Sequence, residues 1–435
     1  MSAPSAPQQR SGIRYISPLA DFLRTEAAGG VLLVVAAVAA LLWANLSPAS
    51  YGSVWHTQAV VSVGRWNLAL DLQHWVNEAL MTMFFLVVGL EIKRELTDGE
   101  LKEPRRAALP FVAAIGGMAV PAAMYALINR GTPTSGGWAI PMATDIAMAL
   151  GVLALLGRRV PSALKLFLLA LAIVDDIGSV VVIALFYGKG LKGEWGLAAL
   201  GLVVLMVVFK RLNVWRVGPY VLIGLFLWLC AYRAGIHPTL VGVLCGLLAP
   251  TKPFLNPGLV DSTALADVSS YDAATETVRL AQQSVSVVEW LEHKLVPWSS
   301  YVVVPLFALA NAGIPVSAEA LSDAITGRLG IGIILGLVVG KALGITLFSW
   351  LGVRTNLVAL PDGVRWIQVL GVASLAGIGF TVSLFVAGLS FDDRTLQDHA
   401  RLAILLATVA AALIGSILLV AATRNEMRRD PASGQ

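Results

Sequence analysis

The chain has 435 residues, of which 57% are hydrophobic and only 13% are charged. Its mean hydropathy of +0.77 excludes an ordinary soluble domain and predicts a protein of the lipid bilayer. The formal charge of +4 does not indicate a nucleic-acid partner, because the basic residues fall in loops between apolar runs and form no dense patch.

About twelve membrane-spanning helices are predicted, because apolar stretches of about 17 to 25 residues recur along the chain. Their centres lie near residues 37, 84, 118, 147, 174, 202, 225, 242, 305, 340, 376 and 409. The fold class is therefore an all-α integral membrane protein. Most Lys and Arg residues lie in the loops on the side of the termini, which predicts that both termini are cytoplasmic. The predicted parts are a tail over 1–24, a transmembrane domain over 25–425 and a tail over 426–435.

Two connecting segments have a character of their own. Residues 58–72 alternate between apolar and polar positions around a Gly-Arg turn, which predicts an extracytoplasmic β-hairpin. A hairpin alone is marginally stable, so we expect it to pair with a second subunit in a homodimer. Residues 251–296 form a predicted cytoplasmic linker that ends in an amphipathic helix over 275–296.

Two groups of three spans, over about 107–187 and 329–421, enter the membrane from opposite sides and indicate inverted repeats. The middle span of each group is interrupted. Pro141 cannot continue the first helix, and Gly377 and Gly379 weaken the second. Ordinary kinks are the alternative, but paired breaks at matching positions of inverted repeats are typical of the mid-membrane site of a transporter.

Four ionisable side chains lie well inside predicted spans: Asp145, Asp175, Asp176 and Lys341. Each costs roughly 2.5 to 3.5 kcal/mol at the centre of a membrane helix, so packing alone does not account for them. A buried ion pair between Asp175 and Lys341 that fixes helix register is the structural alternative, but it leaves Asp176 without a second cation. Neighbours on a helix point about 100° apart, so Asp175 can face the lysine while Asp176 faces an aqueous cavity.

The chemistry of these groups favours cation and proton exchange. Two carboxylates, a Thr hydroxyl and freed backbone carbonyls are oxygen ligands that suit a small hard cation such as Na⁺ or Li⁺, and protons compete for the same carboxylates. Half-helices carry partial charges at their ends, so Asp145 is expected beside facing N-termini and Lys341 beside facing C-termini. Glycine at every fourth position from Gly332 to Gly344 predicts close helix contact.

Six stretches resemble the NhaA family of bacterial Na⁺/H⁺ antiporters: FFLVVGLEIKREL (84–96), GWAIPMATDIAMALGVLALLG (137–157), LALAIVDDIGSVVVIALFY (169–187), VPLFALANAGI (304–314), VVGKALGIT (338–346) and GIGFTVSLFVAGLS (377–390). The resemblance implies twelve helices, two of them broken and crossing at mid-membrane, and a homodimer joined partly through hairpins. It implies electrogenic exchange of Na⁺ or Li⁺ for more than one proton, without a cofactor, in the bacterial inner membrane, for pH and sodium homeostasis.

The resemblance also assigns roles to single residues. Asp176 matches the principal carrier of cation and proton, Asp175 matches the partner of Lys341, and Thr144 with Asp145 matches the pair at the first break. The family's pH-sensing residues are matched by Glu91, Arg94, Glu95, Glu292, His293 and His237. A solvated helix end with i,i+4 charge pairs is the alternative for the first three of these. Glu289 and Val296 depart from the family pattern, which puts the details of pH activation in question.

Three alternatives to a Na⁺(Li⁺)/H⁺ antiporter stay open at this point. A K⁺(Na⁺)/H⁺ antiporter would have the same fold, and a channel would lack coupling between Na⁺ and H⁺ fluxes. The third is an intramembrane enzyme. An aspartyl protease needs aspartates on two helices, and a prenyl transferase needs spaced carboxylates on loops. Adjacent mid-span aspartates fit neither, so the protein is not predicted to be an enzyme.

Overall fold

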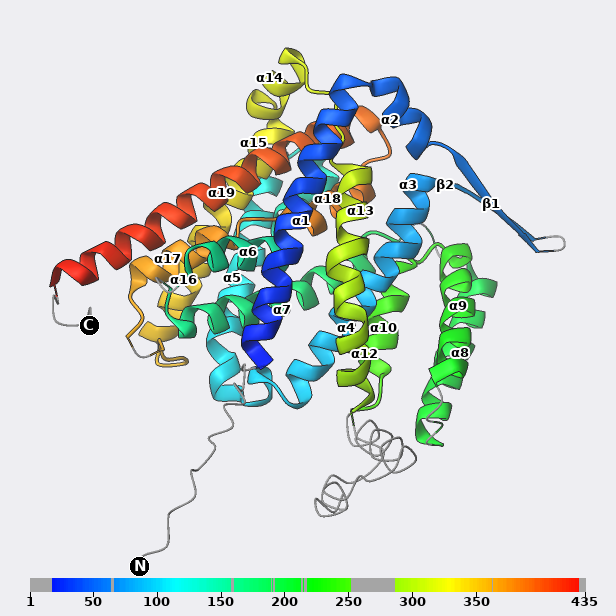
Figure 1. Cartoon of the computed structure of the whole chain (residues 1–435), viewed down its shortest axis with the longest axis horizontal. Coiled ribbons are helices and arrows are strands. Elements are labelled where there is room, and N and C mark those ends of the chain that lie inside the picture. The colour runs from blue at the N-terminus through cyan, green and yellow to red at the C-terminus, as the bar shows by residue number, and fades with distance from the viewer. Residues whose placement is uncertain are drawn as a thin grey trace, which may run out of the picture.

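The computed structural model describes residues 18–429 except 64–65, 158–159, 189, 191, 213, 215–216, 252–285 and 362. The outer parts of both predicted tails and most of the predicted linker, with the first part of its amphipathic helix, lie outside the described residues. The described part is mostly helical, with one two-stranded sheet (Figure 1).

Among the described residues, eight helical stretches are long and apolar enough to cross a membrane by themselves. They are α1 (Pro18–Leu46), the run from α3 (Leu72–Trp75) to α4 (Met81–Thr97), α5 (Pro104–Ile128), α7 (Ser162–Phe186), α8 (Gly193–Arg211), α9 (Val217–Ala234), the run from α15 (Arg328–Ile334) to α16 (Lys341–Arg354), and α19 (Arg394–Arg429). Two bent pairs raise the number to ten. They are the 3₁₀-helix Pro133–Met142 with α6 (Ile146–Leu155), and α17 (Trp366–Leu375) with α18 (Phe380–Ser390).

The two remaining predicted spans, centred near 242 and 305, are also helical. Helix α10 (Thr239–Leu248) has ten residues, so it rises only about 15 Å and is too short to cross the bilayer alone. Helices α12 (Val287–Trp298) and α13 (Val304–Asn311) are joined by a π-helical turn over Ser299–Val303. The predicted all-α membrane fold is confirmed, with one segment shorter than expected.

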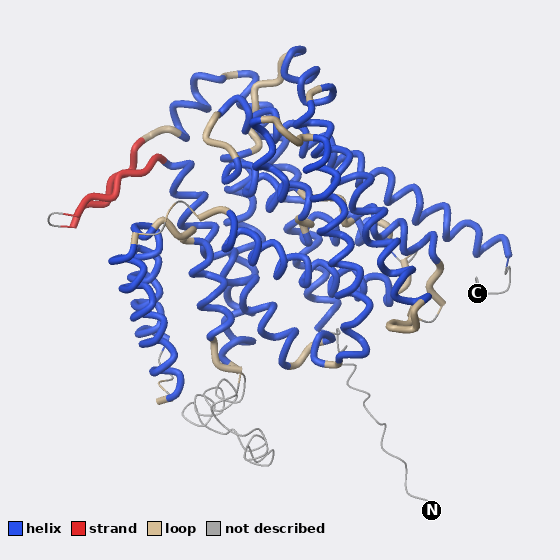
Figure 2. The backbone as a smooth tube through the Cα atoms, turned by 180° about the vertical axis from the view of Figure 1, so that it is seen from behind, coloured by secondary structure: helices blue, strands red, loops and turns tan. Residues whose placement is uncertain are grey.

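The predicted hairpin is present at one end of the molecule. Strands β1 (Gln58–Val63) and β2 (Trp66–Asp71) pair antiparallel, from Gln58 opposite Asp71 to Val63 opposite Trp66. The hairpin projects away from the helices (Figure 2). The short helices α2 (Pro48–Trp55) and α14 (Ala318–Thr326) lie at the same end, whereas the described residues that flank the predicted linker lie at the opposite end (Figure 1).

The base of the hairpin is held by Asp71, which caps α3. Its carboxylate accepts hydrogen bonds from the His74 amide at 2.8 Å and from the His74 ring at 2.6 Å. Burial raises the pKa of Asp71, but the hydrogen bonds from His74 and His56 outweigh it and leave the pKa below its usual value. This stabilisation is therefore complete at neutral pH and is lost only as the pH falls through the lowered pKa.

The glycine face of α15 and α16 packs against α5, as the spacing predicts. A Cβ atom on Gly344 would lie 2.2 Å from the carbonyl oxygen of Gly116, and one on Gly340 would lie 2.9 Å from the Cα atom of Pro121. Side chains at these positions would collide with backbone, which does not yield as a flexible side chain does. Glycine therefore sets the distance between α5 and the helix that carries Lys341.

Replacing Gly344 with Ala is expected to destabilise the protein, because the added methyl group overpacks a backbone contact. The cost is about 1 to 3 kcal/mol, measured as a lower unfolding temperature of the detergent-solubilised protein. Gly201→Ala on α8 is the matched control, since nothing lies within 4 Å of the added Cβ. Equal unfolding temperatures for the two variants would contradict the close contact.

Candidate ion-binding site

The two broken helices cross and contact one another at their breaks. The bend is 47° between Pro133–Met142 and α6, and 50° between α17 and α18. The Asp145 amide donates to the Ile378 carbonyl at 2.7 Å, and the Ser383 hydroxyl donates to the Ile140 carbonyl at 2.8 Å. The backbone groups that the breaks release therefore find partners in the opposite broken helix.

The break residues act through close packing as well as through helix weakening. Gly379 has a φ of −99°, and the φ of Gly377 is not positive, so neither glycine needs the left-handed region. A Cβ atom on Gly377 would instead lie 2.3 Å from the Leu337 carbonyl oxygen. Pro141 packs against the helix of Lys341, because a Cβ atom on Gly336 would lie 2.7 Å from that of Pro141. The first half-helix is a 3₁₀-helix and not the α-helix that its apolar run suggests.

Asp145 lies at the N-termini of two half-helices at once. It is the N-cap of α6, where it accepts from the Met148 amide at 3.0 Å. Its other oxygen accepts from the amide of Thr381 at 3.0 Å and from the Thr381 hydroxyl at 2.8 Å, in the first turn of α18. A carboxylate here complements two partial positive charges in the membrane interior.

Lys341 connects the paired aspartates to the C-terminal end of α17. Its ammonium donates to Asp175 Oδ2 at 2.5 Å and to the Thr144 hydroxyl at 2.9 Å. That hydroxyl in turn donates to the carbonyl oxygen of Ala376, the C-cap of α17, at 2.8 Å. The side chains of Lys341 and Asp175 are both fully buried. Lys341 therefore neutralises one aspartate and reaches the negative helix end through one hydroxyl.

Asp176 points elsewhere, although it is the next residue on α7. It lines a cavity of about 50 Å³ to which Asp175 does not contribute, and this volume holds a few small molecules such as water. Its Oδ1 atom is buried and has no hydrogen-bond partner among the described residues. An unsatisfied carboxylate oxygen beside a small cavity is suited to binding a small cation or a proton.

Side chains that carry oxygen line the cavity from several elements. From the broken helices and α7 come Thr144, Asp145, Asp176 and Thr381. From α4 and the π-helical turn between α12 and α13 come Glu91, Ser299 and Ser300. The sequence alone did not select Thr381, Ser299 or Ser300. Adjacent hydroxyls in an otherwise apolar span are the signal that points to the serine pair.

The predicted pH-sensing residues fall into three places. Arg94 forms an ion pair with Glu292 and lies 3.5 Å from Glu95, which joins α4 to α12. His293 is exposed beside this cluster. Glu91, one turn before Glu95, lines the cavity of Asp176 instead.

His237 lies apart from the Arg94 cluster, near the start of α10. Its Nδ1 atom is 3.8 Å from Glu78 Oε2, and its ring meets the ring of Phe385 edge to face. Glu78 precedes Arg94 by sixteen residues in the helical run from α3 to α4. This separates His237 from the Arg94 cluster by about 24 Å along that run.

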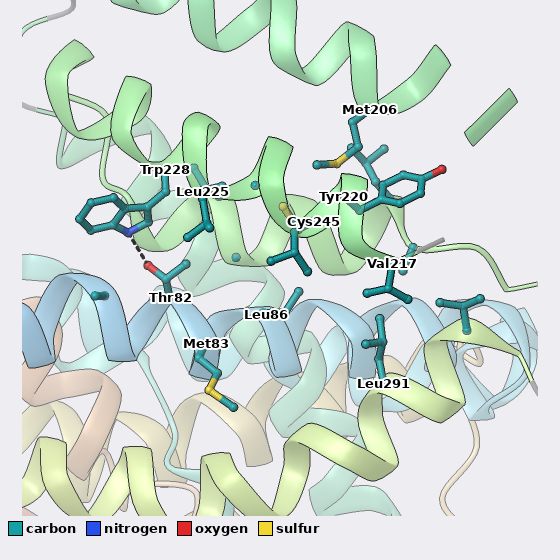
Figure 3. A pocket seen from close by; sticks show the side chains of 18 of the residues that line it. Thr82, Met83, Leu86, Met206, Val217, Tyr220, Leu225, Trp228, Cys245 and Leu291 are labelled. Atoms are coloured by element: carbon teal, nitrogen blue, oxygen red, sulfur yellow. Dashed lines mark hydrogen bonds between the residues drawn. The ribbon is translucent and has the colours of Figure 1, made fainter. Parts of the chain in front are cut away.

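A second, much larger cavity is apolar and offers no carboxylate. Its volume is about 710 Å³, and it lies between α4, α9, α10 and α12 (Figure 3). The Trp228 indole donates to the Thr82 hydroxyl at 3.0 Å at one end, while Leu86, Cys245 and Leu291 line it further along. Its lining among the described residues carries no charged side chain. It therefore lacks the carboxylates that line the small cavity at Asp176.

Comparison with known proteins identifies the relatives of this chain. A family model described as Na⁺/H⁺ antiporter 1 matches residues 20–419. The chain belongs to this antiporter family. A Na⁺/H⁺ antiporter NhaA 3 from Frankia alni is 45% identical over 422 residues, which cover 95% of this chain and 90% of the relative. The Na⁺/H⁺ antiporter NhaA of Oleidesulfovibrio alaskensis is 43% identical, with 93% and 94% covered, and that of Helicobacter pylori strain HPAG1 is 42% identical, with 93% and 95% covered.

Membership of the NhaA family excludes one of the alternatives that the sequence left open. The matched antiporters are transporters and not enzymes, so an intramembrane protease or transferase is ruled out. Na⁺/H⁺ antiport implies no cofactor. The apolar helices and the relatives together make the chain a multi-pass membrane protein.

Proposed function

We propose that this Na⁺/H⁺ antiporter extrudes Na⁺ or Li⁺ in exchange for protons, and that Asp176 holds either ion in turn. The observation that carries the proposal is that Asp176 lines a small cavity and that its buried Oδ1 atom has no hydrogen-bond partner among the described residues. The neighbouring Asp175 is already neutralised by Lys341. Asp176 thus has a negative charge that a proton or a cation can compensate, and a proton on its oxygens excludes the cation.

The other site residues support this exchange in different ways. Asp175 and Thr144 hold the ammonium of Lys341, so of the two predicted cation-binding aspartates Asp176 is the one that lines the cavity. Asp145 stabilises the crossing of the two half-helices and contributes oxygen to the cavity. We infer that the inverted repeats over 107–187 and 329–421 move against the remaining helices, so that the cavity opens to each side alternately. Exchange of more than one proton for each cation makes the transport electrogenic.

Ion selectivity is tested in inside-out membrane vesicles with an imposed acid interior. A pH-sensitive dye follows the gradient while Na⁺, Li⁺ or K⁺ is added. Na⁺ and Li⁺ are expected to dissipate the gradient and K⁺ to leave it unchanged. An equal response to K⁺ would favour the K⁺(Na⁺)/H⁺ alternative, and Na⁺ flux without proton movement would favour a channel.

Membrane placement and assembly extend the proposal. We infer a location in the bacterial inner membrane with both termini cytoplasmic, because the cation-rich loops lie on the side of the termini. Val60 and Val61 of β1 are 55% and 51% exposed. A projecting strand with exposed apolar residues supports a homodimer in which the hairpin over 58–72 pairs with a second subunit.

The cluster of Arg94, Glu95 and Glu292, with His293 beside it, is proposed to adjust activity to cytoplasmic pH. Replacing His293 with Ala is expected to shift the pH profile of antiport, because it removes the imidazole next in sequence to Glu292, the ion-pair partner of Arg94, and histidine is the residue type that most often serves as a pH sensor in proteins. The vesicle assay at a series of pH values measures the shift. Lys294→Ala is the control, since it removes an exposed neighbouring charge and leaves the imidazole in place. Equal profiles for His293→Ala and the parent protein would end this role.

A further inference from the structure

Two adjacent serines line the cavity from a different element than Asp176. Ser299 and Ser300 are 4% and 8% exposed, and both line the cavity. They begin the π-helical turn between α12 and α13. Such turns occur frequently at functional sites. This one places two hydroxyls side by side on a helix that is otherwise apolar over Val302–Ala310.

Ser299 has an unused hydrogen-bonding capacity in this place. Its hydroxyl takes part in no hydrogen bond within the described ranges, and it is not one of the fully buried unpartnered oxygens, so a ligand in the cavity that Ser299 lines can reach it. Asp176 lines the same cavity, and its Oδ1 atom also has no hydrogen-bond partner among the residues described. Two residues with unused oxygens around one small cavity indicate a common ligand, and a cation accepts oxygen lone pairs from both.

We propose that Ser299 and Ser300 supply ligand oxygens to the Na⁺ or Li⁺ ion that Asp176 holds, and so set the affinity for it. The inference rests on the proposed role of Asp176. The carboxylate provides the charge, and the serine hydroxyls replace water molecules that the cation loses on entering the cavity. Ligands then come from two elements, α7 and the π-helical turn, so a movement of one element against the other dismantles the cation site and releases the ion.

The test measures the apparent KM for Na⁺ and for Li⁺ in proteoliposomes at fixed pH. Ser299→Ala is expected to raise the KM roughly three- to tenfold with little change in the maximal rate, and Ser300→Ala is expected to act in the same direction. Ser299→Thr keeps a hydroxyl and should restore a KM near that of the parent protein. Ser349→Ala on α16 is the matched control, because Ser349 is 0% exposed but contributes nothing to the cavity.

The outcomes separate this inference from the proposed function. An unchanged KM for Ser299→Ala would overturn the role of the serines. A KM raised equally by Ser299→Ala and Ser299→Thr would also overturn it, since only the hydroxyl is claimed to matter. Asp176→Asn is measured in parallel. If Asp176→Asn is inactive and the KM is unchanged in both serine variants, the proposed function holds and the inference about the serines is wrong. If Asp176→Asn is active, the proposed function and the inference are both wrong.

Discussion

Asp176→Asn is expected to abolish the response of the vesicle pH gradient to Na⁺ and Li⁺, with normal amounts of protein in the membrane. Asparagine has nearly the same shape but carries neither the charge that attracts the cation nor an exchangeable carboxyl proton. Removing an unpaired buried carboxylate also removes its desolvation cost, so the unfolding temperature should stay the same or rise. Loss of transport without loss of stability separates a role in transport from a role in folding.

The matched control for Asp176→Asn is Asp323→Asn on α14. Asp323 is an exposed aspartate that does not line the cavity, so its replacement should leave the vesicle response intact. Thermal unfolding adds an independent readout, because Na⁺ should stabilise the parent protein and the control but not Asp176→Asn. A full dye response in Asp176→Asn vesicles would remove this residue from the transport site.

The second large effect is expected at the ion pair between Lys341 and Asp175. Lys341→Met leaves the fully buried carboxylate of Asp175 without its cation, which should lower the free energy of unfolding by about 3 to 5 kcal/mol. Asp175→Asn likewise leaves the ammonium of Lys341 buried without its anion. The double variant Lys341→Met with Asp175→Asn is expected to recover most of this stability, because both charges are gone. Thermal unfolding in detergent gives the coupling between the two residues as a double-mutant cycle.

A partly exposed lysine provides the comparison for that cycle. Lys165 on α7 makes a single long hydrogen bond to the Gly157 carbonyl, at 3.4 Å, so Lys165→Met should change the stability by less than about 0.5 kcal/mol. Antiport is expected to be impaired in the double variant even though it folds. If Lys341→Met were as stable as Lys165→Met, the prediction that breaking the Lys341–Asp175 ion pair destabilises the fold would be wrong.

Local features of the sequence predicted the parts of the fold that depend on local physics. The alternation over 58–72 and the apolar runs of the spans give the hairpin and the helices, because side-chain periodicity is a property of one segment. The breaks at Pro141 and at Gly377 follow from backbone chemistry. The 3₁₀ form of Pro133–Met142 and the shortness of α10 do not follow from it, since packing against other helices decides them.

The site shows the same division between local and distant information. Asp175, Asp176 and Lys341 stand out because charge is costly in a membrane span, and the angle between helix neighbours anticipates their different surroundings. The family resemblance grouped Glu91 with Arg94 among the pH-sensing residues, whereas Glu91 lines the cavity of Asp176. The role of Ser299 could not be predicted from the sequence, because only the fold brings the π-helical turn after α12 and helix α7 to one cavity.

The competition between protons and Na⁺ at Asp176 is tested most directly by equilibrium binding of Na⁺ to the purified protein at a series of pH values. If one proton excludes the cation, the apparent Kd should rise about tenfold for each unit of falling pH once the site is mostly protonated. Binding of Na⁺ should also release protons into a weakly buffered solution. A Kd for Na⁺ that stays constant across the pH range, with no proton release, would contradict the exchange of the two ions at one carboxylate.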